Sequence, residues 1–148
     1  MSGFKKEEPQ ISQISQIHLE SPLNKERDPK TYAVIGAAME VHRTIGPGHL
    51  EAVYQESLEI EFESRDIAFV SQPKVPVYYK RHKLRSYYVP DFVVFSAVIV
   101  EIKSQSRLTE VDEAQLLNSL KCCNMKTGLL INFGGPKLYV KKFLMSID

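Results

Sequence analysis

The segment VPDFVVFSAVIVEIKSQ, residues 89–105, is strongly apolar, yet it carries Asp91 near one end and both Glu101 and Lys103 near the other. Charged side chains at or beside buried strand positions cost several kcal/mol when nothing compensates them. A strand pair that served only the hydrophobic core would not need these three residues. The segment therefore predicts a place where charges are brought together and balanced.

The same segment predicts two antiparallel strands, residues 91–95 and 97–103, joined by a short loop. In this register Asp91 lies opposite Glu101, and the alternation of side chains places Glu101 and Lys103 on one face. Two carboxylates and an ammonium group can bind a hard divalent cation and neutralise a phosphate, which is the chemistry of phosphodiester cleavage. A salt-bridge cluster at a strand end is the alternative, and a slip of one residue would separate the faces.

Composition limits the class of protein. With 148 residues, 43% hydrophobic and 25% charged, the chain fits one soluble domain that can form its own core. The net charge of +1 argues against a histone-like binder, so any basic nucleic-acid surface has to be local. No apolar run approaches the roughly 20 residues of a membrane span, and the N-terminus lacks the apolar core of a signal peptide. We therefore expect a cytoplasmic protein.

Two parts of the chain differ in character. Residues 1–27 are rich in Ser, Gln, Glu, Lys and Pro and are predicted to be a flexible N-terminal arm, whose isoleucines could alternatively form a stripe on binding a partner. A single domain, residues 28–148, is predicted to begin at Asp28-Pro29, where an N-cap precedes a proline suited to the first helical position. The adjacent pair Cys122 and Cys123 suits neither a disulfide framework nor a CxxC metal site.

Hydrophobic periodicity predicts a mixed α/β domain whose sheet is covered by helices. Thr109, with Asp112 three residues later, has the pattern of a capping box at the start of the third helix. We expect helices at 29–45, about 49–65 and 109–126, three or four antiparallel strands within 67–80, 83–95 and 97–104, a further strand at 127–134, and a basic tail segment at 137–143.

Two motifs carry a resemblance to a known family. Pro90-Asp91, followed ten residues later by Glu101-Ile-Lys103, resembles the signature of the PD-(D/E)XK nuclease superfamily, and GHLEAVY at 48–54 resembles the motif that names its GxxExxY branch. The resemblance extends from about Leu23 to Phe143. It implies a restriction-endonuclease-like core, a mixed β-sheet flanked by helices, and a Mg²⁺-dependent endonuclease that hydrolyses phosphodiester bonds with a metal-activated water.

The resemblance also implies roles for the charged residues of the strand pair. Asp91 and Glu101 correspond to the carboxylates that bind Mg²⁺ or Mn²⁺, together with the backbone carbonyl of Ile102, and hard oxygen donors suit those ions. Lys103 corresponds to the lysine that orients the attacking water and stabilises charge developing on the phosphate. These are the expected catalytic and metal-binding residues.

Four further residues have both a functional and a structural interpretation. Glu51 matches a helical glutamate that could hold metal through water or complete a second metal position, but it also suits the first turn of a helix. Gln115 matches a glutamine that contacts phosphate or water, or it could cross-link helices. Tyr54 is either a site contact or a packed core residue with a satisfied hydroxyl. For His42 a packing role is favoured over that of a general base.

The expected partner is nucleic acid, DNA before RNA, with no membrane, and a homodimer is as open as a monomer. The alternative function is a catalytically silent nuclease-fold module that binds or scaffolds protein partners. A basic and aromatic segment, Tyr78–Lys83, could contact a phosphate backbone near a hairpin tip, although a solvated turn is the simpler interpretation. The same holds for Lys137, Lys141 and Lys142.

Overall fold

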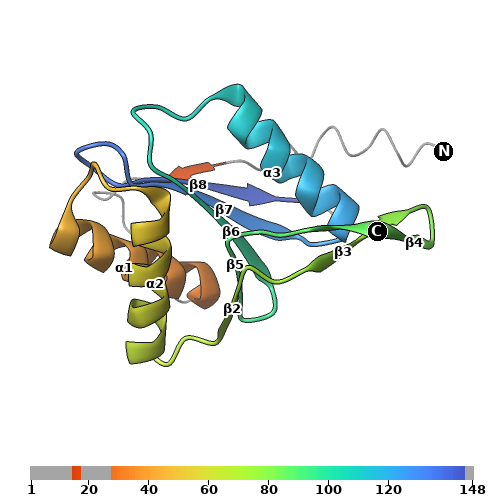
Figure 1. The fold of residues 1–148 in the computed structure, drawn as a ribbon, viewed down its shortest axis with the longest axis horizontal. Coiled ribbons are helices and arrows are strands. Elements are labelled where there is room, and N and C mark those ends of the chain that lie inside the picture. Colours follow the sequence, from red (N-terminus) through yellow and green to blue (C-terminus); the bar gives the residue numbers. More distant parts are fainter. Residues whose placement is uncertain (1–14, 18–27, 146–148) are drawn as a thin grey trace.

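The computed structural model describes residues 15–17 and 28–145. Figure 1 shows a central sheet with helices on both sides and a separate two-stranded ribbon that projects from one end. The helices are α1 (Pro29–Ile45), α2 (Glu51–Ser64) and α3 (Glu110–Cys123). The strands are β1 (Ser15–Ile17), β2 (Phe69–Ser71), β3 (Val75–Tyr79), β4 (His82–Tyr88), β5 (Phe92–Val94), β6 (Val98–Lys103), β7 (Thr127–Asn132) and β8 (Tyr139–Leu144).

The main sheet has the strand order β1-β8-β7-β6-β5-β2, and β3 pairs only with β4. Among the described strand pairs, β6 and β7 are parallel and the others are antiparallel. A parallel pair needs a crossover connection, and α3 provides it between β6 and β7. The sheet is therefore mixed and is flanked by helices. This confirms the predicted restriction-endonuclease-like α/β architecture.

Strand β6 lies between β7 and β5 in the sheet, and both of its faces are covered. Val100 and Ile102 belong to the core cluster under α1 and α2, whereas Ile99 packs with Leu116 and Leu120 of α3 on the opposite face. Side chains alternate along a strand, so Glu101 and Lys103 point to the α3 side. The two charged residues of this strand thus lie at its carboxyl end, where the covering helix begins.

The predicted helix starts are confirmed. Asp28 caps α1 by accepting a hydrogen bond from the Thr31 backbone N–H at 3.2 Å, and Pro29 occupies the first helical position. At α3 the Thr109 hydroxyl accepts from the Asp112 backbone N–H, and the Asp112 carboxylate accepts from the Thr109 backbone N–H, which is a reciprocal capping box. Both caps are local in sequence, which is why periodicity and residue type were sufficient to find them.

The basic tail segment at 137–143 was wrongly predicted, because most of it belongs to strand β8, Tyr139–Leu144, which pairs with β7. Its two lysines obscured the strand pattern. Lys141 Nζ lies 2.9 Å from a carboxylate oxygen of Glu113 on α3, and Lys142 pairs with Asp28 at the start of α1. These ion pairs compensate the charges inside the sheet, so the two lysines are not free to form a phosphate-binding surface.

The predicted N-terminal arm is described only at Ser15–Ile17, which form β1 and pair antiparallel with β8. These three residues therefore add an edge strand to the main sheet. The rest of the predicted arm, including Ile11 and Ile14 of the isoleucine stripe, lies outside the described residues.

Gly134 marks a close approach between the chain after β7 and the chain after β6. A Cβ at Gly134 would lie 2.6 Å from the Gln105 carbonyl carbon and closer still to its backbone N and O atoms. We expect Gly134→Ala to lower the free energy of unfolding by about 1–3 kcal/mol, because backbone has to move to relieve the overlap. Urea unfolding of Gly134→Ala beside Gly135→Ala measures this. Gly135 is the matched control, since its added Cβ meets nothing nearer than 3.5 Å.

Candidate active site

The charged strand pair has the register that the sequence predicted. Strands β5 and β6 pair Phe92 with Val100 and Val94 with Val98, which continues to place Asp91 beside Glu101. A three-residue loop joins them, in which Phe95 and Ser96 take left-handed φ values of 56° and 55°. Beside the loop each strand is one residue shorter than predicted, since β5 ends at Val94 and β6 begins at Val98. The predicted register between the two strands is confirmed.

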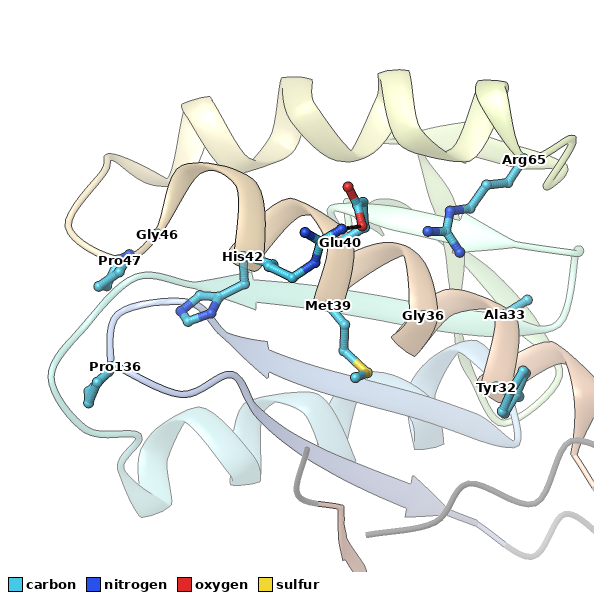
Figure 2. A pocket seen from close by; sticks show the side chains of 11 residues that line it. Tyr32, Ala33, Gly36, Met39, Glu40, His42, Gly46, Pro47, Arg65 and Pro136 are labelled. Carbon is cyan, nitrogen blue, oxygen red and sulfur yellow. Dashed lines mark hydrogen bonds and ion pairs between the residues drawn. The ribbon is translucent and has the colours of Figure 1, made fainter. Parts of the chain in front are cut away.

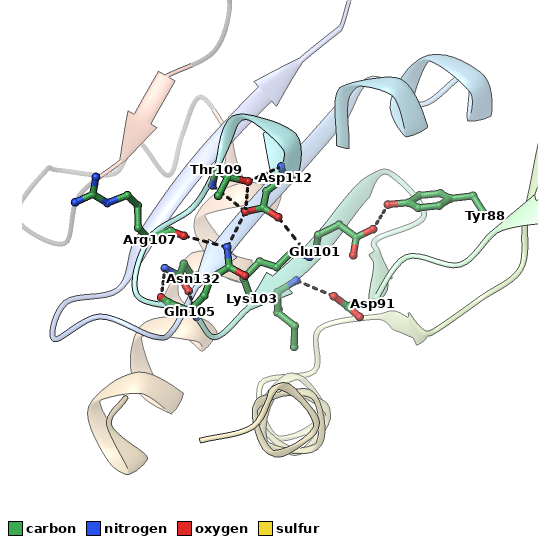
Figure 3. Close-up of polar contacts among 10 residues, drawn as sticks. Tyr88, Asp91, Glu101, Lys103, Gln105, Arg107, Thr109, Asp112 and Asn132 are labelled. Atoms are coloured by element: carbon green, nitrogen blue, oxygen red, sulfur yellow. Dashed lines mark hydrogen bonds and ion pairs between the residues drawn. The ribbon is translucent and has the colours of Figure 1, made fainter. Parts of the chain in front are cut away.

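Asp91 is held at several points. Its Oδ2 accepts a hydrogen bond from the Ile102 backbone N–H at 2.7 Å (Figure 3). Its carbonyl oxygen accepts from Gln72 N–H at 2.9 Å and from the buried Gln55 side-chain amide on α2 at 3.0 Å. Asp91 is therefore fixed between the sheet and α2, and Gln55 is a supporting residue that the sequence did not identify.

Glu101 is a carboxyl group whose charged form is disfavoured in the metal-free protein. Burial raises its pKa to about 7, while the Lys103 ammonium and the Asp91 backbone N–H act to lower it, and the negative charge of Glu51 raises it further. Its Oε2 accepts a hydrogen bond from the Tyr88 hydroxyl (Figure 3). Tyr88 lies at the end of β4, and nothing in the sequence pattern indicated that it reaches this carboxylate.

The pKa of Asp91 is raised in the same way. Burial is the main cause, the hydrogen bond from Ile102 and the charge of Lys103 oppose it, and the charge of Glu51 adds to it. The carboxyl groups of Asp91 and Glu101 are therefore partly desolvated, and the charge of Glu51 repels their charged forms. A bound cation would relieve this excess of negative charge.

Lys103 faces an acidic partner, Asp112, that the sequence pattern identified only as part of a helix cap. The Lys103 Nζ lies 3.8 Å from Oδ1 of Asp112, whose Oδ2 accepts a hydrogen bond from the Gln105 side-chain amide at 2.7 Å (Figure 3). Burial raises the pKa of Asp112, but hydrogen bonds from Thr109 and Gln105 outweigh it and lower the pKa. A charged Asp112 thus helps to position the ammonium group of Lys103.

Glu101, Lys103 and Asp112 line a hollow of about 360 Å³ between the sheet and α3, whereas Asp91 is not among its lining residues. Gln115 lies exposed at its wall, so the structure brings this residue together with Glu101 and Lys103, although its side chain has no hydrogen bond among the described residues. Its wall carries the ammonium group of Lys103 and the side-chain amides of Gln115 and Asn118. The lining residues are Tyr88, Glu101, Lys103, Asp112, Gln115, Leu116, Asn118, Ser119 and Leu130.

Glu51 contributes negative charge to the site. It is exposed in the first turn of α2, and its charge acts on both Asp91 and Glu101. Within residues 15–17 and 28–145, no group of three His, Cys, Asp or Glu side chains is arranged to hold a metal ion. Mg²⁺ usually keeps several waters and is bound through one or two carboxylates, so Asp91 and Glu101, with the Ile102 carbonyl, fit such an ion.

Tyr54 and His42 have the packing roles that were their structural alternatives. The buried Tyr54 ring stacks on Phe133 with 4.4 Å between centroids, and its hydroxyl donates to the Gly46 carbonyl at 2.6 Å. The buried His42 bonds through Nε2 to the Gly135 carbonyl at 3.0 Å and lines a different hollow, of about 710 Å³, beside α1 (Figure 2). Neither side chain contacts the carboxylate pair.

No curated protein and no solved structure matches the chain. In the described part of the chain, none of the helices is long and apolar enough to cross a membrane. A family model does match, over residues 28–143, a range that contains the carboxylate pair, Lys103 and the helices around them. The chain therefore belongs to the PD-(D/E)XK nuclease superfamily.

Proposed function

We propose that this protein is a metal-dependent nuclease of the GxxExxY branch, which hydrolyses phosphodiester bonds in nucleic acid, with DNA expected before RNA. The observation that carries the proposal is the strand register, which puts Asp91 beside Glu101, together with the hollow that Glu101 lines with Lys103. Both carboxyl groups have raised pKa values, which a bound cation would lower. Membership of the superfamily adds to this support.

Asp91, Glu101 and the Ile102 carbonyl would hold Mg²⁺ or Mn²⁺, with Glu51 reaching it through water. When bound, such an ion lowers the pKa of its water and neutralises charge on the phosphate. Lys103 would donate a hydrogen bond to a phosphate oxygen or to the attacking water, and its ammonium group, 3.8 Å from the Asp112 carboxylate, would be held in position by that charge. Gln115, on the facing wall of the hollow, would contact the phosphate.

The proposal is tested by incubating the purified protein with labelled single-stranded, duplex and branched DNA and with RNA, in Mg²⁺, Mn²⁺ or EDTA. We expect cleavage of at least one substrate with either metal and none in EDTA. A folded protein that cuts none of them would overturn the proposal and favour the binding or scaffolding module.

Metal binding itself is predicted to depend on Asp91. We expect Asp91→Asn to weaken Mn²⁺ binding at least about tenfold in isothermal titration calorimetry, because even changes to residues that only support metal ligands cost about 10- to 100-fold. Asp66→Asn is the matched control, since it removes the same charge from an exposed turn after α2. Equal Mn²⁺ affinity in the two variants would show that Asp91 is not a ligand.

A further inference from the structure

The ribbon formed by β3 and β4 has an unusual charge. It stands apart from the main sheet and projects from one end of the molecule (Figure 1). Between Asp66 and Asp91 there is no acidic residue, although the whole chain has a net charge of only +1, so the rest of the chain is net negative. The basic residues of this stretch are Lys74, Lys80, Arg81, Lys83 and Arg85, with His82 at the turn.

Cations and aromatic rings share one face of the ribbon. Pro76 pairs with Tyr87 and Tyr78 pairs with Lys83, with a shift of register between the two pairs. Directly paired residues share a face, and Pro76 and Tyr78, two positions apart on β3, point to the same side. Lys74 lies on this face as well, since its Nζ is 4.9 Å from the centre of the Tyr87 ring. Tyr78 is 43% exposed and Tyr87 is 52% exposed. This exposed face of the ribbon therefore carries both phenol rings and ammonium groups.

The opposite face of the ribbon is anchored at the candidate active site. Val75 pairs with Tyr88, and the Tyr88 ring packs against the core cluster that contains Leu116 of α3. The Tyr88 hydroxyl donates its hydrogen bond to Glu101. One side of the ribbon thus contacts a proposed metal ligand, while the other side presents its cations and rings to solvent.

The ribbon charges are not balanced within the described residues. None of the five Lys and Arg side chains between residues 74 and 85 forms an ion pair there. Charged residues on an edge strand can serve only to prevent aggregation. That explanation does not cover the tyrosines, because each exposes about half of its surface on the same face and adds apolar area to it.

We infer that the β3–β4 ribbon is an arm that binds single-stranded nucleic acid and delivers it to the active site. Its cations contact backbone phosphates, and Tyr78 and Tyr87 stack on unpaired bases, which base-paired duplex would not offer. The inference rests on the proposed function, since it takes the bound strand to be the substrate. It adds the location of the substrate-binding surface and the form of substrate that fits it.

The arm is tested by fluorescence anisotropy with a labelled single-stranded DNA oligonucleotide, in EDTA so that nothing is cut. We expect Lys83→Ala/Arg85→Ala to weaken binding about tenfold or more and to reduce the slope of log affinity against log salt by roughly 1.4, or about 0.7 for each phosphate that is no longer neutralised. We expect Tyr78→Ala/Tyr87→Ala to weaken binding by a similar factor with the salt slope unchanged, because stacking releases no counterions.

The matched control is Lys30→Ala/Arg43→Ala, which removes one Lys and one Arg from the surface of α1 on the other side of the sheet. All changed side chains are exposed, and circular dichroism verifies that each variant is folded. Arm variants that bind like this control, or a wild type that binds no single strand, would overturn the inference even if cleavage of duplex is observed. Binding that depends on the arm in a protein that cuts nothing would support the single-strand-binding surface but refute the proposed function and, with it, the delivery of a substrate.

Discussion

Lys103→Ala is expected to lower the rate of single-turnover cleavage by about 10²–10³, which is the usual cost of removing one group that stabilises transition-state charge. The ammonium group of Lys103 is the basic group in the lining of the hollow, which Glu101 also lines, and it is 3.8 Å from the Asp112 carboxylate. The rate is measured with substrate bound and Mg²⁺ in excess.

The loss is expected in the chemical step rather than in binding. Lys103→Ala keeps both carboxylates of the proposed metal site, so the protein should still bind Mn²⁺, and it keeps the ribbon, so it should still bind single-stranded nucleic acid. Lys30→Ala, which removes an exposed lysine of α1, is the control. If Lys103→Ala cleaves as fast as this control, Lys103 has no catalytic role and the assigned mechanism is wrong.

Glu101→Gln is expected to stabilise the metal-free protein by about 3 kcal/mol at pH 8 and to leave its stability nearly unchanged at pH 4. In the folded protein the pKa of Glu101 is raised from 4.5 to about 7, chiefly by burial. Below pH 4.5 the carboxyl group is neutral in both states. As the pH rises from 4.5 to 7 the unfolded chain releases this proton first, so stability is lost through that window.

Glutamine avoids this loss because it stays neutral, and its side-chain oxygen can still accept the hydrogen bond from Tyr88. Urea unfolding in EDTA at the two pH values, for wild type and Glu101→Gln, measures the difference. Glu56→Gln, at an exposed position of α2, is the control. Added Mn²⁺ is expected to have the opposite effect on the two proteins, because it should raise the free energy of unfolding of the wild type but not that of Glu101→Gln. Equal destabilisation of Glu101→Gln at both pH values would contradict the proposed cost of the buried charge.

This trade between stability and function explains why so apolar a strand pair carries charged residues. Asp91 and Glu101 weaken the metal-free fold, and only part of their charge is balanced by Lys103 and by backbone N–H groups. A pair of carboxylates that weakens the fold is consistent with the proposed cation site, because local rules of core packing are broken mainly at functional sites.

The sequence by itself determined the features that depend on neighbours along the chain. The alternation of Asp91, Glu101 and Lys103 across a short loop predicted the strand register, and the residue types at Asp28 and Thr109 predicted the helix starts. Turns, caps and hairpins are specified by residues a few positions apart, so their patterns can be seen without a structure.

Only the tertiary structure decided the contacts between distant segments. It placed Asp112 beside Lys103 and brought the Tyr88 hydroxyl of the separate ribbon to Glu101. It also paired Lys141 of strand β8 with Glu113, in a segment whose basic composition had suggested a tail. It also assigned Tyr54 to the core, where its ring stacks on Phe133, a residue that is distant in the sequence. Such contacts depend on how helices and strands pack in three dimensions, and the periodicity of a single segment contains no information about them.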